Sequence, residues 1–275
     1  MGMKSICLKK HKGKKEGELS TMQEITVGII GCGFIGGALK KWLEEHNPNI
    51  DILVSDPPKG MNDDVTIADV IFISIHIPTE NDGTQNLDLL KELIKPIPQN
   101  TPIFVRTTVL PTTCDNLSAE LGKRVYFMPE FLTERTAYQD FCTQPMIFTA
   151  EESLLKRIFI GKKYITMSSL EAEITKYAHN DFGAVKVTYF NAIYDLCQKM
   201  HCDYKKVQNG VLLSGYINDM HTHVPGPDGK LGYGGKCFPK DVKAIMHAFK
   251  NQPIEKILSV VDDINDKLRN VLTRI

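Results

Sequence analysis

One cysteine of this 275-residue chain stands in a setting that would make its thiol reactive. Cys237 ends a glycine-rich segment, residues 232–237, and comes just before residues 239–249, which are predicted to form a helix. Lys236 and Lys240 lie on either side of the cysteine. A thiol near a helix N-terminus and beside two ammonium groups is expected to have a lowered pKa and to be a better nucleophile. A buried structural cysteine is the alternative, but it explains neither the glycines nor the two lysines.

Two more polar side chains share one face of a long predicted helix. Residues 170–200 contain no proline and one glycine, and their pattern is helical. Lys176 and Asn180 are four residues apart, so they lie on the same face of that helix. By itself, such a lysine would be a surface residue with a buried aliphatic stem. Asp181 and Lys186 fall elsewhere on the helix, and we expect both to face solvent.

The N-terminal part of the chain contains a strand, a glycine turn and a helix in direct succession. Residues 25–30 form a short apolar run that is typical of a strand buried on both faces. Gly31-Cys-Gly-Phe-Ile-Gly36 follows, and residues 37–45 are predicted to be helical. A second strand, residues 51–56, ends in a carboxylate about 20 residues past the last glycine, so the pattern predicts a dinucleotide-binding motif. The predicted cofactor contacts in this unit are Gly31, Gly33, Phe34, Ile35, Gly36 and Asp56.

Each part of this motif has a physical role. Gly31 permits the tight turn, Gly33 lets the backbone approach a diphosphate, and Gly36 lets the helix pack on the strand. The diphosphate would lie over the helix N-terminus, where N–H groups without helical partners and the helix dipole favour anions. Asp56 would accept hydrogen bonds from ribose hydroxyls and repel a 2′-phosphate, so the predicted cofactor is NAD rather than NADP.

Further apolar runs alternate with helical segments, which predicts a Rossmann-type, doubly wound parallel sheet followed by an all-α dimerisation and catalytic domain. The predicted strands are residues 68–75, 102–105, 125–128, 146–149 and 164–167, and we expect the last two to complete the same sheet. Polar residues follow three of these strands, at the edge where ligands bind in such sheets. These candidate site residues are His76, Pro78, Thr79, Arg106, Thr107, Thr108, Pro129, Glu130 and Phe131.

Composition excludes several classes of protein. The 33 basic and 33 acidic side chains balance, which argues against a protein that binds nucleic acid or a membrane surface. No apolar run approaches the roughly 18 residues of a membrane span. The seven cysteines have the spacing of neither a disulfide framework nor a metal site, so we expect a cytoplasmic protein without a bound metal. The expected segments are a disordered basic tail (1–24), an NAD-binding domain (25–168) and a helical domain with the cysteine loop (169–275).

Taken together, six motifs resemble those of the nucleotide-sugar dehydrogenases, the family of UDP-glucose and GDP-mannose dehydrogenases. They run in family order from about Ile25 to the end of the chain, and the last of them is very specific. The matching segments are Gly31–Gly36, Pro78-Thr79, Thr107–Val109, Pro129–Leu132, Glu173–Asn180 and Gly232–Asp241.

This resemblance implies that the chain oxidises the C6 alcohol of a nucleotide sugar to a carboxylate, with two molecules of NAD accepting one hydride each. Cys237 corresponds to the nucleophile of the family. Its thiolate captures the intermediate aldehyde as a thiohemiacetal, and oxidation of that adduct gives a thioester that water hydrolyses. Lys176 and Asn180 would stabilise the developing oxyanion. Asp241 resembles the residue that positions Lys176 and the hydrolytic water.

The resemblance also assigns residues that contact the reacting groups and the ligands. Glu130 and Thr108 correspond to the residues that hold water and relay protons. Besides the glycine turn and Asp56, the implied cofactor contacts are Pro78, Thr79, Thr108, Glu134 and Lys240. The implied substrate contacts are Glu130, Phe131, Leu132, Lys176, Asn180, Tyr233 and Gly234.

The chain departs from the family pattern in three places. Family members continue into a further α/β domain that binds the nucleotide diphosphate, and this chain ends where that domain would begin. The segment from Asp56 to Ala68 is shorter than the corresponding segment of the family. We therefore expect part of the sheet and of the adenine pocket to be absent. The family places an arginine, donated across the dimer, near Tyr216, and here residues 223–230 form an insertion. Residues 254–275 carry an apolar helical stripe that we expect to pack against a second copy in a homodimer.

Two alternatives belong to other functional classes. A β-hydroxyacid dehydrogenase has a similar layout and a lysine four residues before an asparagine, but it transfers one hydride and needs no cysteine. A non-catalytic remnant would bind a nucleotide or a partner chain without forming NADH. The intact set of catalytic residues favours an enzyme over a remnant.

Overall fold

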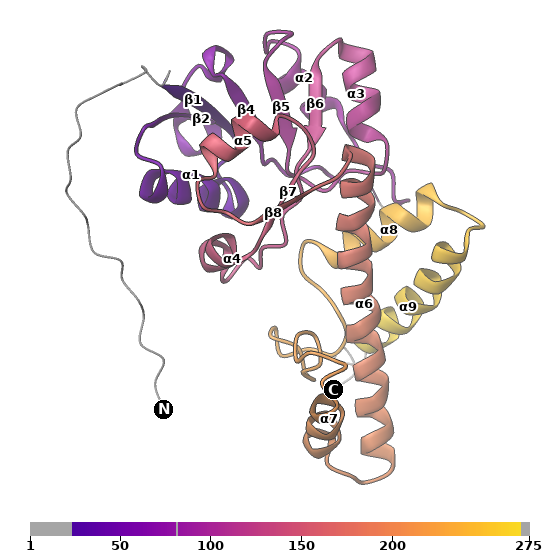
Figure 1. Ribbon diagram of the computed structural model, residues 1–275. Helices are drawn as coiled ribbons and strands as arrows, with labels where there is room; N and C mark the ends of the chain where they lie inside the picture. The colour runs from indigo at the N-terminus through magenta and orange to yellow at the C-terminus, as the bar shows by residue number, and fades with distance from the viewer. Residues whose placement is uncertain (1–23, 81, 271–275) are drawn as a thin grey trace, which may run out of the picture.

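The computed structural model describes residues 24–80 and 82–270. Its N-terminal half contains a six-stranded sheet in the order β3-β2-β1-β4-β5-β6, in which only the β2–β3 pair is antiparallel. The strands are β1 Ile25–Ile30, β2 Ile50–Asp56, β3 Met61–Asn62, β4 Val70–Ile73, β5 Pro102–Val105 and β6 Arg124–Phe127. The predicted doubly wound, mostly parallel sheet followed by a helical half is confirmed (Figure 1). Of the predicted basic tail, residues 1–23 lie outside the described residues.

Helices cover both faces of the sheet because its central strands are apolar on both sides. Every residue of β4 and β5 is buried. α1, α4 and α5 pack on one face around Trp42, and α2 and α3 pack on the other around Leu90 and Leu117. The bounds are α1 Phe34–His46, α2 Asp88–Ile94, α3 Thr113–Leu121, α4 Ala137–Thr143 and α5 Glu152–Ile158, with short 3-10 turns at Pro57–Lys59 and Val65–Ile67. The carboxyl ends of the central strands therefore stay open at one edge, where ligands bind in this fold.

The last two predicted strands do not join this sheet, so that expectation was wrong. β7 Met146–Phe148 and β8 Tyr164–Thr166 pair with each other in a separate parallel ladder. The outer edge of β6 is occupied by side chains instead of a further strand. Ser118 Oγ and Ser169 Oγ each accept a hydrogen bond from a β6 N–H group at 3.1 Å. Because these N–H groups already have partners, β6 is the edge strand of the large sheet.

The helical half is organised around α6 Ser169–Lys199, which runs away from the sheet (Figure 1). The helix begins at a capping box, in which Ser168 and Glu171 each accept a hydrogen bond from the other's backbone N–H. The other helices of this half are α7 Tyr204–Leu213, α8 Phe238–Ala248 and α9 Pro253–Asn270. Gly183 allows α8 to approach α6 closely, since a Cβ at this position would lie 2.5 Å from the Phe238 ring.

The apolar stripe of α9 is partly buried within the chain itself. Leu258 and Val261 are buried in a cluster formed with α6 and α8. Ile254, Ile257 and Val260 are exposed. Packing of this stripe against a second copy stays a prediction, and its last residues, 271–275, lie outside the described part. Among the described helices, none is long and apolar enough to cross a membrane.

Candidate active site

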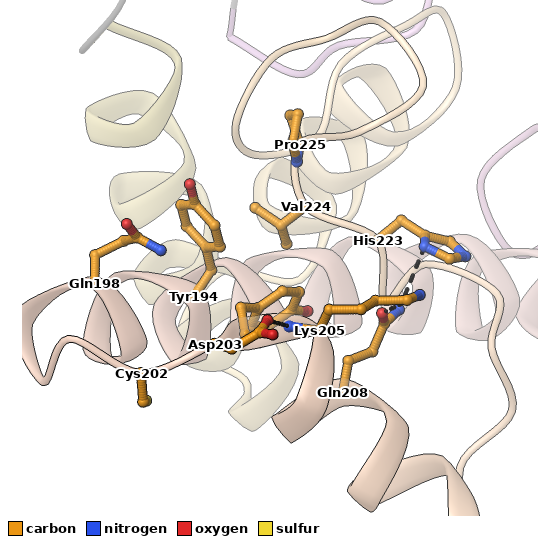
Figure 2. A pocket seen from close by; sticks show the side chains of 10 residues that line it. Tyr194, Gln198, Cys202, Asp203, Lys205, Gln208, His223, Val224 and Pro225 are labelled. Atoms are coloured by element: carbon orange, nitrogen blue, oxygen red, sulfur yellow. Dashed lines mark hydrogen bonds between the residues drawn. The ribbon is translucent and has the colours of Figure 1, made fainter.

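A pocket of about 470 Å³ lies where the sheet meets the helices. Three predicted groups share its wall: the glycine turn after β1, residues that follow β4, β5 and β6, and the loop that carries Cys237. The lining residues are Gly33, Phe34, Ile35, Ser74, Ile75, His76, Thr107, Thr108, Glu130, Lys236, Cys237 and Lys240. Another cavity, of about 390 Å³, lies between the end of α6, α7 and the loop through His223, and none of the predicted site residues line it (Figure 2).

The glycine turn is shaped by close backbone contacts. Gly31 has a φ of +82°, and a Cβ there would lie 2.7 Å from the Ser74 carbonyl oxygen. A Cβ at Gly36 would lie 2.0 Å from the Gly31 carbonyl oxygen, so only glycine fits under the turn. A Cβ at Gly33, in contrast, would meet nothing within 4 Å. The turn is therefore open on the side that the motif predicts for a diphosphate.

Three further features fit a bound dinucleotide. α1 begins after Gly33 without a side-chain cap and without an acid in its first turn, so its first N–H groups are available to an anion. The buried Ser74 hydroxyl, in the pocket wall, has no hydrogen-bond partner among the described residues. Asp56 Oδ2 accepts the Cys32 N–H at 2.8 Å, and Lys59 Nζ lies 3.7 Å from the same oxygen. Asp56 thus fixes the glycine turn, a role that adds to the ribose contact predicted for it.

Lys176 from α6 and Glu130 after β6 form a buried ion pair. Lys176 Nζ lies 3.0 Å from Glu130 Oε1 and also donates to the Glu130 carbonyl oxygen. The two side chains are 5% and 7% exposed. Glu130 Oε2 accepts the Leu132 N–H at 2.7 Å, which fixes the carboxylate from its other side. Because the pair is desolvated, loss of either partner would leave an uncompensated buried charge.

Asn180 and Asp241 form a second buried pair one turn along α6. Asn180 Nδ2 donates to Asp241 Oδ2 at 2.6 Å, and Lys240 Nζ donates to Asp241 Oδ1. Asp241 is fully buried. The hydrogen-bond partners of Asp241 are therefore Asn180 and Lys240, whereas Lys176, which the family resemblance pairs with Asp241, is held by Glu130.

The lowered thiol pKa predicted for Cys237 was wrong in direction. Cys237 does precede the first residue of α8, as expected. The Cys237 residue is exposed at the pocket wall, but desolvation of the thiol by the surrounding atoms and the nearby Asp241 carboxylate raise its pKa above the ordinary value. Lys176 and Lys240 oppose this shift without reversing it. The resting thiol is therefore protonated at neutral pH, because desolvation outweighs the lysines on which the prediction relied.

An Asp241→Asn variant is expected to accelerate alkylation of Cys237 by iodoacetamide at neutral pH. The change removes a carboxylate that raises the thiol pKa, so a larger fraction of Cys237 is thiolate, the form that reacts. Peptide mass mapping across a pH series measures the alkylation rate, which rises about tenfold per pH unit below the thiol pKa. Asp263→Asn, an exposed change on α9, is the matched control. An equal or higher thiol pKa in Asp241→Asn would contradict this account.

Several predicted ligand contacts lie outside the pocket wall. Tyr233 is buried between the helices, and its hydroxyl donates to an α9 carboxylate at 2.7 Å. A Cβ at Gly234 would lie 2.0 Å from the Arg269 side chain, so this glycine lies against α9. Glu134 forms an exposed ion pair with Lys236 at 2.9 Å. The loop that carries Cys237 is therefore held by α9 through Tyr233 and Gly234, and by the segment after β6 through the Lys236–Glu134 ion pair.

The loop after β6 brings an aromatic ring to the lysine. The Phe131 ring lies 5.5 Å from Lys176 Nζ and 4.7 Å from the His179 ring. Burial and the Lys176 charge lower the pKa of His179. Leu132, next in the chain, is partly buried in the core of the sheet half.

Gln85 is a site-supporting residue that the sequence did not reveal. Its side-chain amide donates to the Thr108 carbonyl oxygen at 3.3 Å and to the Tyr177 hydroxyl at 3.1 Å. Its carbonyl oxygen accepts the Leu110 N–H at 3.0 Å. Thr79, a predicted cofactor contact, pairs with Gln85 through an isolated β-bridge. The sequence does not indicate that Gln85 supports the site, because its hydrogen-bond partners lie more than 20 positions away along the chain.

The sequence did not indicate that two ionisable side chains are buried, although Arg106 was among the candidate site residues. Asp181, predicted to face solvent, is 4% exposed, and burial together with Asp241 raises its pKa to about 8. Arg106 is buried behind the pocket, and burial lowers its pKa to about 10 against the opposing effect of Glu130. Helical spacing gave no indication that Asp181 is buried, because the elements that cover it come from elsewhere in the chain.

Comparison with known proteins places the chain among nucleotide-sugar dehydrogenases. Residues 170–267 match the model of the central domain of the UDP-glucose/GDP-mannose dehydrogenase family. A UDP-glucose 6-dehydrogenase from Rickettsia conorii is 31% identical over 218 residues, covering 73% of this chain and 49% of the relative. The chain belongs to the UDP-glucose/GDP-mannose dehydrogenase family. It spans about half the length of the curated relatives of this family that it matches.

Solved structures share the fold of this family member. A UDP-glucose dehydrogenase from Pyrobaculum islandicum has a TM-score of 0.71 at 21% identity, covering 90% of this chain and 69% of that structure. A 3-hydroxyisobutyrate dehydrogenase from Mycobacterium tuberculosis has a TM-score of 0.64 at 17% identity, covering 90% of this chain and 96% of that structure. At these identities the likeness establishes the fold alone.

Proposed function

We propose that this chain oxidises the C6 alcohol of a UDP-glucose-type nucleotide sugar to a carboxylate, with Cys237 as the covalent nucleophile and NAD as the hydride acceptor. One observation carries the proposal: Cys237 and the dinucleotide-type turn at Gly33 line the same pocket. A thiol beside a hydride acceptor can trap the carbonyl that the first oxidation creates.

Two donors are suited to stabilise negative charge on the substrate oxygen. Lys176 is held by Glu130, and Asn180 is held by Asp241. Donors fixed in advance stabilise an oxyanion without reorganising as the charge develops. In this proposal they act when the Cys237 sulfur bonds to the aldehyde carbon and again when water attacks the thioester.

The protonated resting thiol requires a base. As Cys237 attacks, its proton must pass to a nearby group, and the carboxylates close enough to shift the thiol pKa are those of Asp241 and Glu130. Both carboxylates already accept two hydrogen bonds through their side-chain oxygens, but Asp241 does not line the pocket. We assign the proton transfer to Glu130, which also lines the pocket and is placed to activate the hydrolytic water.

Counting NADH per sugar tests the proposal. The full chain is incubated with limiting UDP-glucose and excess NAD, and the sugar products are separated by chromatography. Two NADH per sugar, together with UDP-glucuronate, are expected. One NADH per sugar would replace the proposal with a single hydride transfer, and cofactor binding without NADH would replace it with a non-catalytic binding role.

A second candidate function is single hydride transfer to NAD from a β-hydroxyacid. The observation that favours this alternative is the placement of Lys176 four residues before Asn180 on α6, with both side chains buried. Such an enzyme would use Lys176 and Asn180 but would not depend on Cys237. NADH formation from 3-hydroxyisobutyrate that survives loss of the thiol would support it.

We further propose that the protein is cytoplasmic and forms a homodimer through the outer face of α6. None of the described cysteines forms a disulfide, which suits a reducing compartment. Large apolar side chains are exposed at intervals of four to eight residues along α6. A continuous apolar face of this kind normally marks an interface. Its exposed members are Ile174, Phe182, Tyr189, Leu196 and Met200.

A Tyr189→Glu variant is expected to shift the protein from dimer to monomer. Tyr189 is 58% exposed near the middle of this α6 face, so a dimer would bury the new carboxylate without a partner. Ile165→Glu places the same charge on β8 at a side chain that is 56% exposed, and it is expected to leave the dimer intact. Light scattering after size-exclusion chromatography measures both masses. A wild-type monomer at micromolar concentration would refute the dimer.

A further inference from the structure

The C-terminal end of α6 brings two cysteines together. His201 adopts the left-handed conformation, with a φ of +51°, and its N–H donates to the Gln198 carbonyl oxygen at 3.2 Å. The Cys202 N–H donates to the Cys197 carbonyl oxygen at 2.9 Å. These two bonds form a Schellman motif, in which the side chains of the residues at the positions of Cys197 and Cys202 commonly pack together.

The two thiols differ in exposure. Cys197 is 3% exposed, whereas Cys202 is exposed and lines the cavity of about 390 Å³ shown in Figure 2. Desolvation and, after it, the Cys202 thiol raise the pKa of Cys197, so the buried thiol is protonated at neutral pH. A dissolved oxidant can therefore reach Cys202 directly, while Cys197 has only to reach its neighbour.

The cavity beside Cys202 lies on a different face of α6 from the proposed dimer interface. α6 contributes Tyr194 and Gln198 to the cavity wall, and each lies two positions from Leu196, an exposed member of that interface. Residues two positions apart do not share a helix face. A dimer formed through the outer face of α6 therefore leaves this cavity open.

We propose that Cys197 and Cys202 are a redox-active pair, which a hydroperoxide converts into an intramolecular disulfide and a dithiol reduces again. In the first step, the Cys202 thiolate attacks the terminal oxygen of the hydroperoxide and the O–O bond breaks. Cys202 becomes a sulfenic acid, and the departing oxygen takes up the proton that the thiol released. In the second step, the Cys197 sulfur attacks the Cys202 sulfur, the S–O bond breaks, and the hydroxyl group leaves as water with the Cys197 proton. The pair loses two electrons, and the hydroperoxide gains them.

The position of the pair favours this reaction and gives it a structural consequence. A disulfide requires Cα atoms about 4.4–6.8 Å apart, a separation that a direct backbone hydrogen bond between the two residues favours. Cys202 comes just before Asp203, which caps α7 by accepting the Lys205 N–H at 2.8 Å. The bond would therefore fix the turn between α6 and α7 and one wall of the cavity. Neither cysteine lines the catalytic pocket, so this inference is independent of the proposed dehydrogenase activity.

Peptide mapping tests the pairing, because trypsin cleaves after Lys199, between the two cysteines. The reduced full chain is treated with hydrogen peroxide, its remaining thiols are blocked with iodoacetamide, and it is digested. A product in which residues 187–199 and 200–205 are joined by a disulfide is expected, and dithiothreitol is expected to remove it. Its yield is expected to be independent of protein concentration, because the bond forms within one chain. Oxidation of Cys202 without this linked product, or its pairing with a second chain, would overturn the proposal.

Two variants separate the roles of the two thiols. Cys197→Ser removes the second thiol, so Cys202 is expected to accumulate as a sulfenic acid and to be labelled by dimedone at least about fivefold more than in the wild-type chain. Cys142→Ser, a half-buried change on α4, is the matched control and is expected to form the linked product as the wild-type chain does. Equal dimedone labelling of Cys202 in the wild-type and Cys197→Ser chains would overturn the proposal. The linked product is scored in the wild-type chain, so that test holds even if a variant fails to fold.

Discussion

Replacing Cys237 with alanine is expected to lower formation of the carboxylate product by at least about a thousandfold, the scale of loss when a covalent nucleophile is removed. Without the sulfur, the aldehyde formed by the first hydride transfer has no group to hold it as a thiohemiacetal, so the second oxidation has no substrate. Chromatography of the sugar products after incubation with UDP-glucose and NAD measures the loss.

Two controls separate this chemical effect from a structural one. Cys202→Ala removes another exposed thiol, near the far end of α6, and is expected to keep full activity. The affinity of Cys237→Ala for NAD, measured by titration calorimetry, is expected to stay within about twofold of wild type, because the glycine turn is untouched. Full turnover in Cys237→Ala would favour the single-hydride alternative.

A Lys176→Met variant is expected to lose both activity and stability. Removing a preorganised oxyanion donor costs about 10²–10³ in turnover. The variant also leaves the Glu130 carboxylate buried without its partner, which costs about 3–5 kcal/mol of unfolding free energy. Steady-state kinetics measure the first loss, and urea denaturation measures the second.

Combining Lys176→Met with Glu130→Gln separates the two losses. The double variant removes both charges of the pair, so part of the lost stability is expected to return while activity stays low. Recovery is expected to be incomplete, because the buried Arg106 loses the Glu130 carboxylate beside it. Lys199→Met changes an exposed lysine on the same helix, and it is expected to alter neither property. An active Lys176→Met protein, or a double variant no more stable than Lys176→Met, would contradict the roles assigned to this ion pair.

The sheet and the glycine turn were predictable because their signals are local. A strand buried on both faces must be apolar throughout, and β5 occupies the predicted residues 102–105. The tight contact at Gly36 is likewise encoded in the spacing of three glycines. Residues 146–149 met the same criterion for a strand, but their place outside the main sheet depends on serine side chains that occupy the β6 edge.

The pairings of the site were not predictable from the residues alone, because they join distant segments. Glu130 and Lys176 are separated by 46 positions, and Asn180 and Asp241 by 61. The prediction of a lowered thiol pKa was wrong for the same reason: the sequence shows the lysines beside Cys237 but not the desolvation and the Asp241 carboxylate that raise the pKa. Asp181 was placed on the surface because nothing along the helix indicates that other elements cover it.

The most direct test of the central claim is protection of Cys237 by the aldehyde form of the substrate. The chain is treated with UDP-glucose 6-aldehyde without NAD and then with iodoacetamide, and peptide mass mapping counts alkylated Cys237, with the exposed Cys202 as the internal reference. If the sulfur bonds to the substrate carbon, alkylation of Cys237 slows at least about tenfold while that of Cys202 does not change. Equal alkylation of Cys237 with and without the aldehyde would contradict the covalent mechanism.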